Sequence, residues 1–180
     1  MIVDVRGSND SDGTWDHWGP EEQADLKQVI ESIAAQPWCT GKVGMVGCSY
    51  FAMSQLLAAE QQPEGLAAIF PYDAMTDIYR DAYYHGGIYS NWGRFWFQSL
   101  SFLNNTSGRL KDPSGFRYHF DRVLGGSDPL DGPYYWERSS GPNLYGYRRT
   151  SAATGVSSAY ISAALSRAGR VFLRPHPERC

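Results

Sequence analysis

The sequence is short of the features that mark several classes of protein. It has 180 residues and three cysteines at unrelated spacings, which suggests neither a disulfide framework nor a zinc site and favours a reduced, cytoplasmic setting. No apolar run approaches the ~20 residues of a membrane span, and the N-terminus lacks the order of a signal peptide. The net charge of −3 offers no electrostatic attraction to nucleic acid. We therefore expect no metal, no cofactor, and neither nucleic acid nor a membrane as a partner.

What the sequence does contain is enough apolar material for a packed domain. Hydrophobic residues make up 42% of the chain and aromatic residues 14%, which excludes a disordered polypeptide. The aromatic load of 6 Trp, 12 Tyr and 8 Phe suggests aromatic-lined surfaces as well as a core.

The first 70 residues alternate between strand and helix patterns. Apolar runs predict strands, and a periodic apolar face behind Pro20 predicts a helix that ends before Pro37. The expected strands are Ile2–Val5, Val43–Val46 and Leu66–Phe70, and the second expected helix is Phe51–Gln61. This β-α-β-α-β order predicts parallel strands in an α/β sheet. Because domains rarely begin inside their own sheet, we also expect the chain to be truncated at its start.

A Gly-x-Ser motif joins the second expected strand to the second helix, at Gly47 and Ser49. By itself the motif favours a simple explanation, in which Ser49 caps the helix. The sharper alternative is a nucleophile elbow, where a serine on a strained turn points at substrate and needs small neighbours. The strict pattern fails because Phe51 holds the last Gly position and Ala52 follows. The location of Ser49 at the carboxyl end of a parallel strand, where ligands bind in such sheets, favours the elbow.

The remainder of the chain changes character twice. Residues 73–140 are aromatic and Gly-rich, and we expect them to form a helical insertion over the top edge of the sheet. An aromatic group in this insertion could wall an acyl pocket or simply pack a core: Tyr83, Tyr84, Trp92, Phe95 and Trp96. Residues 141–180 hold six Arg, no Lys and one acid, Glu178. That tail is either a basic extension or sequence never selected to fold, and we favour the second.

Four ordered segments resemble the cocaine esterase and X-prolyl dipeptidyl-peptidase (CocE/NonD-type) family of α/β-hydrolases. They read "DVRGSNDSDG", "WGPEEQADLKQVIESIAAQPWCTGKVGMVGCSY", "LAAIFPYDAMTDIYRDAYYHGGI" and "GPYYWERS". The resemblance covers roughly residues 2–140. It implies that residues 1–72 form part of the hydrolase core, with its parallel sheet and nucleophile elbow, and that residues 73–140 form the helical cap.

The resemblance implies acyl-transfer chemistry at the elbow. Ser49 would be the nucleophile, and the backbone N–H of Tyr50 would donate to the oxyanion. The family's second oxyanion donor, a tyrosine hydroxyl, would precede Met1, and its triad aspartate and histidine follow the cap on strands that this chain does not reach. None of the four histidines fits as the base; His176 comes in the right order but lies in the tail.

Two functions therefore stay open for this polypeptide. The first is a serine hydrolase of esters, amides or X-Pro peptides that is an inactive fragment, because the triad Asp and His are missing. The second is a non-catalytic α/β-hydrolase-like module that keeps the elbow as structure and binds through its aromatic face. Substrate identity and oligomeric state cannot be read from the sequence.

The composition of the tail yields a test at the level of the gene. In the resembling family, the "YYWERS" segment leads to a buried strand, whereas here Gly, Ser and Arg follow. We expect translation in one of the other two frames downstream of codon 140 to give a strand, a Gly-aromatic-x-Asp motif and a later histidine. If neither frame does, the tail is genuine and the binding module becomes the better explanation.

Overall fold

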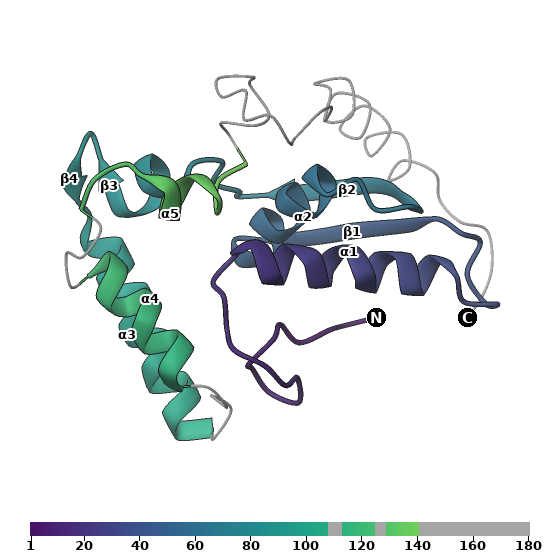
Figure 1. Ribbon diagram of the computed structural model, residues 1–180, viewed down its shortest axis with the longest axis horizontal. Coiled ribbons are helices and arrows are strands. Elements are labelled where there is room, and N and C mark those ends of the chain that lie inside the picture. Colours follow the sequence, from purple (N-terminus) through teal and green to yellow (C-terminus); the bar gives the residue numbers. More distant parts are fainter. Residues whose placement is uncertain (108–112, 125–128, 141–180) are drawn as a thin grey trace. The chain divides into compact units, whose positions relative to one another are not determined.

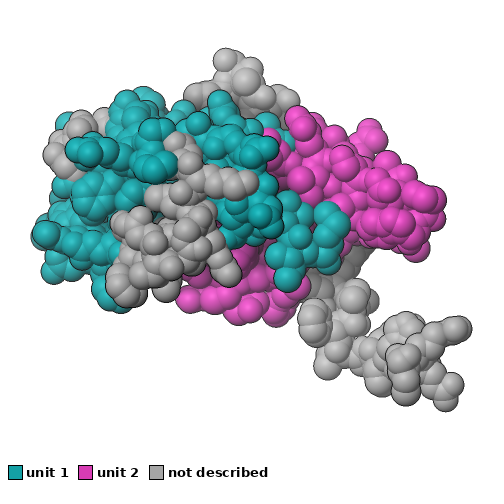
Figure 2. All heavy atoms as spheres, turned by 90° about the horizontal axis from the view of Figure 1, so that it is seen from below, with its two compact units in different colours: residues 1–24, 75–139 teal, residues 25–74, 140–180 magenta. Residues whose placement is uncertain are grey.

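The computed structural model describes residues 1–107, 113–124 and 129–140, and the expectations for the tail lie outside these residues (Figure 1). The chain forms two compact units, which Figure 2 distinguishes by colour. The first unit combines Met1–Ala24 with Met75–Ser139, and the described part of the second is Asp25–Ala74 with Ser140. Within the described residues, no helix is long and apolar enough to cross a membrane.

The second unit is built around a parallel strand–helix–strand unit, as the sequence predicts. Strand β1 pairs in parallel with β2, and Met45 lies opposite Ile69. The helix between them, α2, packs against both strands. Both strands and both helices fall within two residues of the sequence prediction, at α1 (Pro20–Ala34), β1 (Val43–Cys48), α2 (Tyr50–Glu60) and β2 (Leu66–Tyr72).

One face of this small sheet carries the buried contacts and the other does not. Helix α2 is buried along Ala52–Ala58, and Ile69 on β2 is 4% exposed. The side chains that alternate with Ile69 point the other way, and Val46, Phe70 and Tyr72 on that face are 64%, 39% and 49% exposed.

The strand expected at Ile2–Val5 is absent, so that prediction was wrong. These residues have no regular structure, and Ile2 is 95% exposed. A strand forms only when its backbone N–H and C=O groups find a neighbouring strand. Among the described residues, no strand pairs with this segment. The apolar pattern alone cannot supply that partner.

The first unit is mostly helical. A π-helical segment, η1, contacts α3, α5 and the short hairpin formed by β3 and β4. Its elements are η1 (Ile78–Tyr83), β3 (Tyr84–His85), β4 (Ile88–Tyr89), α3 (Asn91–Ser107), α4 (Pro113–Val123) and α5 (Pro133–Trp136).

Aromatic rings form the core of this unit. Trp15 stacks on Phe116 at 5.9 Å, and Tyr83 stacks on Phe97 at 6.1 Å between ring centroids. Tyr83 and Tyr84 are buried, whereas Phe95 is 70% exposed. Core packing therefore accounts for the two tyrosines of the aromatic group that the sequence singles out.

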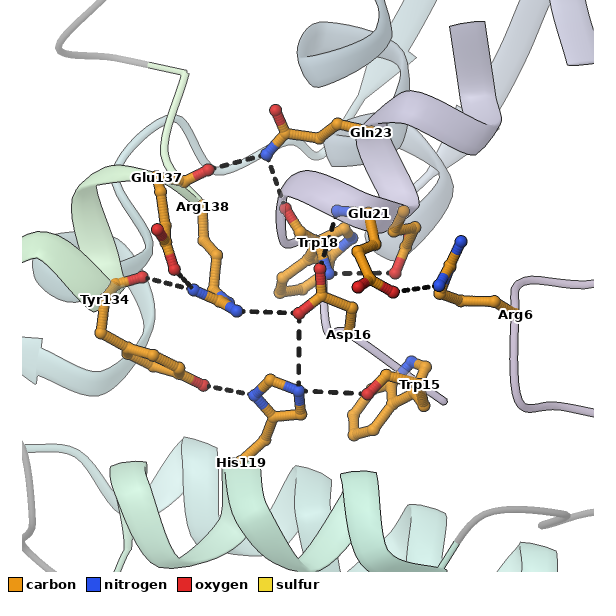
Figure 3. A network of polar contacts seen from close by, with 11 residues as sticks. Arg6, Trp15, Asp16, Trp18, Glu21, Gln23, His119, Tyr134, Glu137 and Arg138 are labelled. Atoms are coloured by element: carbon orange, nitrogen blue, oxygen red, sulfur yellow. Dashed lines mark hydrogen bonds and ion pairs between the residues drawn. The ribbon is translucent and has the colours of Figure 1, made fainter. Parts of the chain in front are cut away.

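A buried arginine joins the N-terminal loop to the segment after α5 (Figure 3). Arg138 is 3% exposed, and its guanidinium lies 2.9 Å from the Asp16 carboxylate and 4.2 Å from the Tyr134 ring centroid. It also donates to the backbone carbonyl of Tyr134 at 3.0 Å. The side chain of Gln23 donates to the carbonyl of Glu137 at 2.7 Å. Loop and segment are thus held by charge-assisted and backbone contacts together.

His119 belongs to the same network. Its Nε2 lies 3.2 Å from the Trp15 carbonyl, which can only accept, so Nε2 carries the proton. Its Nδ1 accepts from the Tyr134 hydroxyl at 2.9 Å. Burial, with a further contribution from the Arg138 charge, lowers the pKa of His119 to about 4.

This lowered pKa predicts a loss of stability in mild acid. The unfolded chain takes up the His119 proton near its ordinary pKa of 6.5, whereas the folded protein resists it until about pH 4. The stability that neutral His119 contributes is therefore fully present above pH 6.5 and is lost as the pH decreases toward 4. Between about pH 7 and pH 5, His119 removes about 2 kcal/mol from the free energy of unfolding.

Urea unfolding of the parent and of His119→Gln at both pH values measures this contribution. We expect the parent to lose about 2 kcal/mol more than the variant between the two pH values. Subtracting the two losses cancels the contributions of all titratable groups that both proteins share. Equal losses in the two proteins would contradict the assignment.

Candidate active site

Ser49 occupies the turn between β1 and α2, where the sequence predicts it. The strand ends at Cys48 and the helix begins at Tyr50, so a single residue joins them. Its backbone has φ 56° and ψ −118°. A non-Gly residue at positive φ is uncommon, and such a conformation costs on the order of 1–3 kcal/mol. Ser49 is therefore held in a strained turn.

The side-chain contacts of Ser49 are not those of a capping residue. Its side chain makes no capping hydrogen bond to the helix. Ser49 stands at the N-cap position, and its backbone carbonyl accepts from the N–H groups of Ala52 and Met53 at 2.9 and 3.0 Å, as the carbonyl of any N-cap residue does. What is missing is the bond from the hydroxyl oxygen to a helical N–H, so the hydroxyl takes no part in capping the helix. This favours the elbow interpretation over the cap.

Gly47 allows the strand and the helix to approach each other. A Cβ atom at position 47 would lie 2.5 Å from the Cβ of Phe51, closer than real side chains come. Ala52, which stands near the last Gly position of the strict motif, is fully buried. Gly47 and Ala52 are therefore small because the strand and the helix pack closely at these positions, as a nucleophile elbow requires.

Gln55 is a polar residue of this site that the sequence argument missed. It is 1% exposed, six residues after Ser49, in a buried stretch of α2 whose other residues are apolar except Ser54. Its Oε1 accepts from the backbone N–H of Phe70 at 2.9 Å, and its Nε2 donates to the carbonyl of Phe51 at 2.8 Å. The same nitrogen lies 3.4 Å from the carbonyl of Gly47. The available signal was a glutamine in the middle of a mostly apolar helix segment.

Tyr50 is the first residue of α2, one residue before the expected start of the helix. Its carbonyl accepts from the Ser54 hydroxyl at 3.0 Å. Cys48, on the other side of Ser49, is half-buried, and its Sγ lies 3.9 Å from the Asp73 carboxylate. Within the described residues, no group of three or more His, Cys, Asp or Glu side chains could hold a metal ion.

The described histidines all belong to the first unit, and each has its own contacts there. His17 is fully buried, with Nε2 2.7 Å from the Tyr83 hydroxyl, and burial holds its pKa well below the ordinary value. His85 is exposed, with Nε2 2.8 Å from the carbonyl of Asp81. His17 and His119 thus pack the core, and His176 lies outside the described residues.

A parallel strand, a serine in a strained turn and a helix packed back on the strand are also the parts from which the nucleophile elbow of α/β-hydrolases is built. The family model described as X-Pro dipeptidyl-peptidase (S15 family) matches residues 1–150. The chain belongs to this family, as the ordered motifs indicate.

Individual relatives agree with this assignment. The chain is 39% identical to the cocaine esterase of a Rhodococcus species over 88 residues, and 36% identical over 91 residues to a Mycobacterium bovis protein named as a candidate serine esterase. These matches cover 48% and 50% of this chain, but only 15% and 14% of the relatives. A CocE/NonD family hydrolase from Staphylococcus aureus superposes with a TM-score of 0.63 at 29% identity, covering 75% of this chain and 23% of that one. This chain therefore corresponds to a small share of each of these relatives.

The close approach at Gly47 gives a direct test of the turn. Gly47→Ala places a methyl group against Phe51, and we expect it to lower the free energy of unfolding by about 1–3 kcal/mol. Gly44→Ala is the matched control, because a Cβ on that residue of the same strand meets nothing nearer than 3.9 Å. Urea unfolding of both variants measures the difference. Equal stability of the two would contradict the packing described here.

Proposed function

We propose that this chain carries the nucleophile elbow of a serine hydrolase that acts by acyl transfer on esters, amides or X-Pro peptides. The observation that carries the proposal is the strained backbone of Ser49 at the β1–α2 turn, with a hydroxyl that takes no part in capping the helix. Strain of this kind persists only where the surroundings impose it, and it is concentrated at functional sites. Family membership and the names of the relatives support the same class of reaction.

In the proposed reaction, Ser49 Oγ attacks the carbonyl carbon of the substrate. The hydroxyl proton passes to a histidine, the acyl group is transferred to Oγ, and the alcohol or amine leaves with a proton. Water then cleaves the acyl-enzyme by the same route. The site residues of this chain supply the nucleophile, and the general base has to be a histidine held by a carboxylate.

Tyr50 would stabilise the oxyanion that forms in each step. Its backbone N–H belongs to the first turn of α2, where the amide groups point out of the helix N-terminus. Such a donor, aimed at the developing charge, typically lowers the barrier by about 3 kcal/mol. The helix dipole acts in the same direction.

We further propose that the 180-residue chain alone lacks the base and is inactive. His17 and His119 are buried and engaged by tyrosine hydroxyls, and the ring of His85 contacts a backbone carbonyl. The Asp16 carboxylate lies 3.9 Å from His119 Nε2, beyond hydrogen-bond distance (Figure 3), and no hydrogen bond described for the three rings is to a carboxylate. Without a base, the hydroxyl of Ser49 is a weak nucleophile.

One experiment with two arms tests both proposals. In the first arm, the full chain is treated with a fluorophosphonate probe and p-nitrophenyl acetate, with Ser49→Ala as the background. In the second, Val43–Tyr72 replaces the corresponding strand–helix–strand segment of the S. aureus hydrolase, which retains its own remaining residues. We expect no reaction above background from the chain. We expect labelling and ester hydrolysis from the hybrid, both abolished by Ser49→Ala.

The outcomes separate the proposals. Stoichiometric labelling of the isolated chain that depends on Ser49 would show that a base is present, and His176 would be the first residue to mutate. If the hybrid has the circular dichroism spectrum of its parent but is neither labelled nor active, Ser49 is not a nucleophile. That result would favour a non-catalytic module that binds through its aromatic face.

A further inference from the structure

The side chain of Gln55 connects the three backbone segments that surround Ser49. It lies on α2, accepts from Phe70 on β2, and donates to the first turn of α2 at Phe51. Its amide nitrogen also lies 3.4 Å from the carbonyl of Gly47 on β1. Two strands and one helix are therefore tied together by a single buried amide, next to the turn.

Only a side-chain amide satisfies all three groups. Gln offers one acceptor oxygen and two N–H donors, whereas Glu at neutral pH only accepts, and Met has no donor and only a weakly accepting sulfur. The missing side chain at Gly47 belongs to the same arrangement, since a Cβ there would lie 3.4 Å from the Gln55 nitrogen. Because Gln55 is 1% exposed, its amide would be costly to bury without these partners.

We propose that Gln55 is a positioning residue that holds Ser49 in its strained conformation; the catalytic meaning of this role rests on the proposed function of Ser49. A residue at φ 56° returns to an ordinary backbone conformation unless its neighbours prevent it. Gln55 fixes the strand end on one side of Ser49 and the first helical turn on the other. It acts through the backbone and does not contact substrate.

A double-mutant cycle in the full chain tests the link between the two residues. Ser49→Gly relieves the positive φ, and we expect it to raise the folding equilibrium constant about fivefold, the strain relief exceeding the added entropy of the unfolded chain. In a Gln55→Met background the turn relaxes, so the same substitution should change the constant less than twofold. Urea unfolding measures all four proteins.

The control is a glutamine that makes only a local bond. Gln36 is exposed and donates to the carbonyl of Ser32 at 2.9 Å, like the bond of Gln55 to Phe51. Ser49→Gly should keep its full effect in a Gln36→Met background. If the effect is also undiminished with Gln55→Met, Gln55 does not hold the turn and the inference is overturned.

A kinetic measurement separates positioning from general stabilisation. In the hybrid enzyme, which contains Gln55 with all three partners, we expect Gln55→Met to lower kcat at least tenfold and to leave KM within twofold. An unchanged kcat would overturn the positioning role while the activity of the hybrid still supports Ser49 as the nucleophile. If the hybrid is inactive even with Gln55 in place, the proposed function of Ser49 is contradicted instead. The double-mutant cycle in the full chain then still decides whether Gln55 holds the turn.

Discussion

The close contact between β1 and the first turn of α2 is the constraint from which the geometry of the site follows. At Gly47 the strand passes so near to Phe51 that no side chain fits between them. With the strand and helix this close, one residue has to reverse the chain, and that residue takes a positive φ. Gln55 reaches the strand end because the same space is open. The strain at Ser49 and the burial of Gln55 both result from the close approach of β1 to the first turn of α2.

The first unit is stabilised by different means. Its core consists of aromatic rings, with tyrosine hydroxyls and imidazole rings satisfying one another inside it. Arg138 carries a full charge into this environment, where the Asp16 carboxylate and the Tyr134 ring face it. Breaking a buried pair by removing one partner is costly because the other charge is left behind. This unit is therefore sensitive to the charge states of residues far apart in the sequence.

The features that could be predicted from the sequence are those encoded locally. Pro20 sets the start of α1, and the Gly-x-Ser motif marks the turn at Ser49, because each signal lies within a few residues of its effect. Features that depend on a distant partner escaped prediction. Ile2–Val5 has a strand pattern but no strand to pair with among the described residues. Arg138 gives no sign in the sequence of its pairing with Asp16, 122 residues away. Gln55 differs again, since its partners are near in sequence but only folding brings them to one amide.

The compactness of the β1–α2–β2 unit has a consequence for the order of folding. Every contact that holds the turn, from Gly47 through Gln55 to Phe70, is made within this one strand–helix–strand segment. The chain that has to close is short, so the entropy lost on closure is small, and contacts of low sequence separation form fast. The ribosome also delivers all of these residues before the segments that follow them. The geometry around Ser49 can thus be acquired during synthesis, ahead of the segments that follow it.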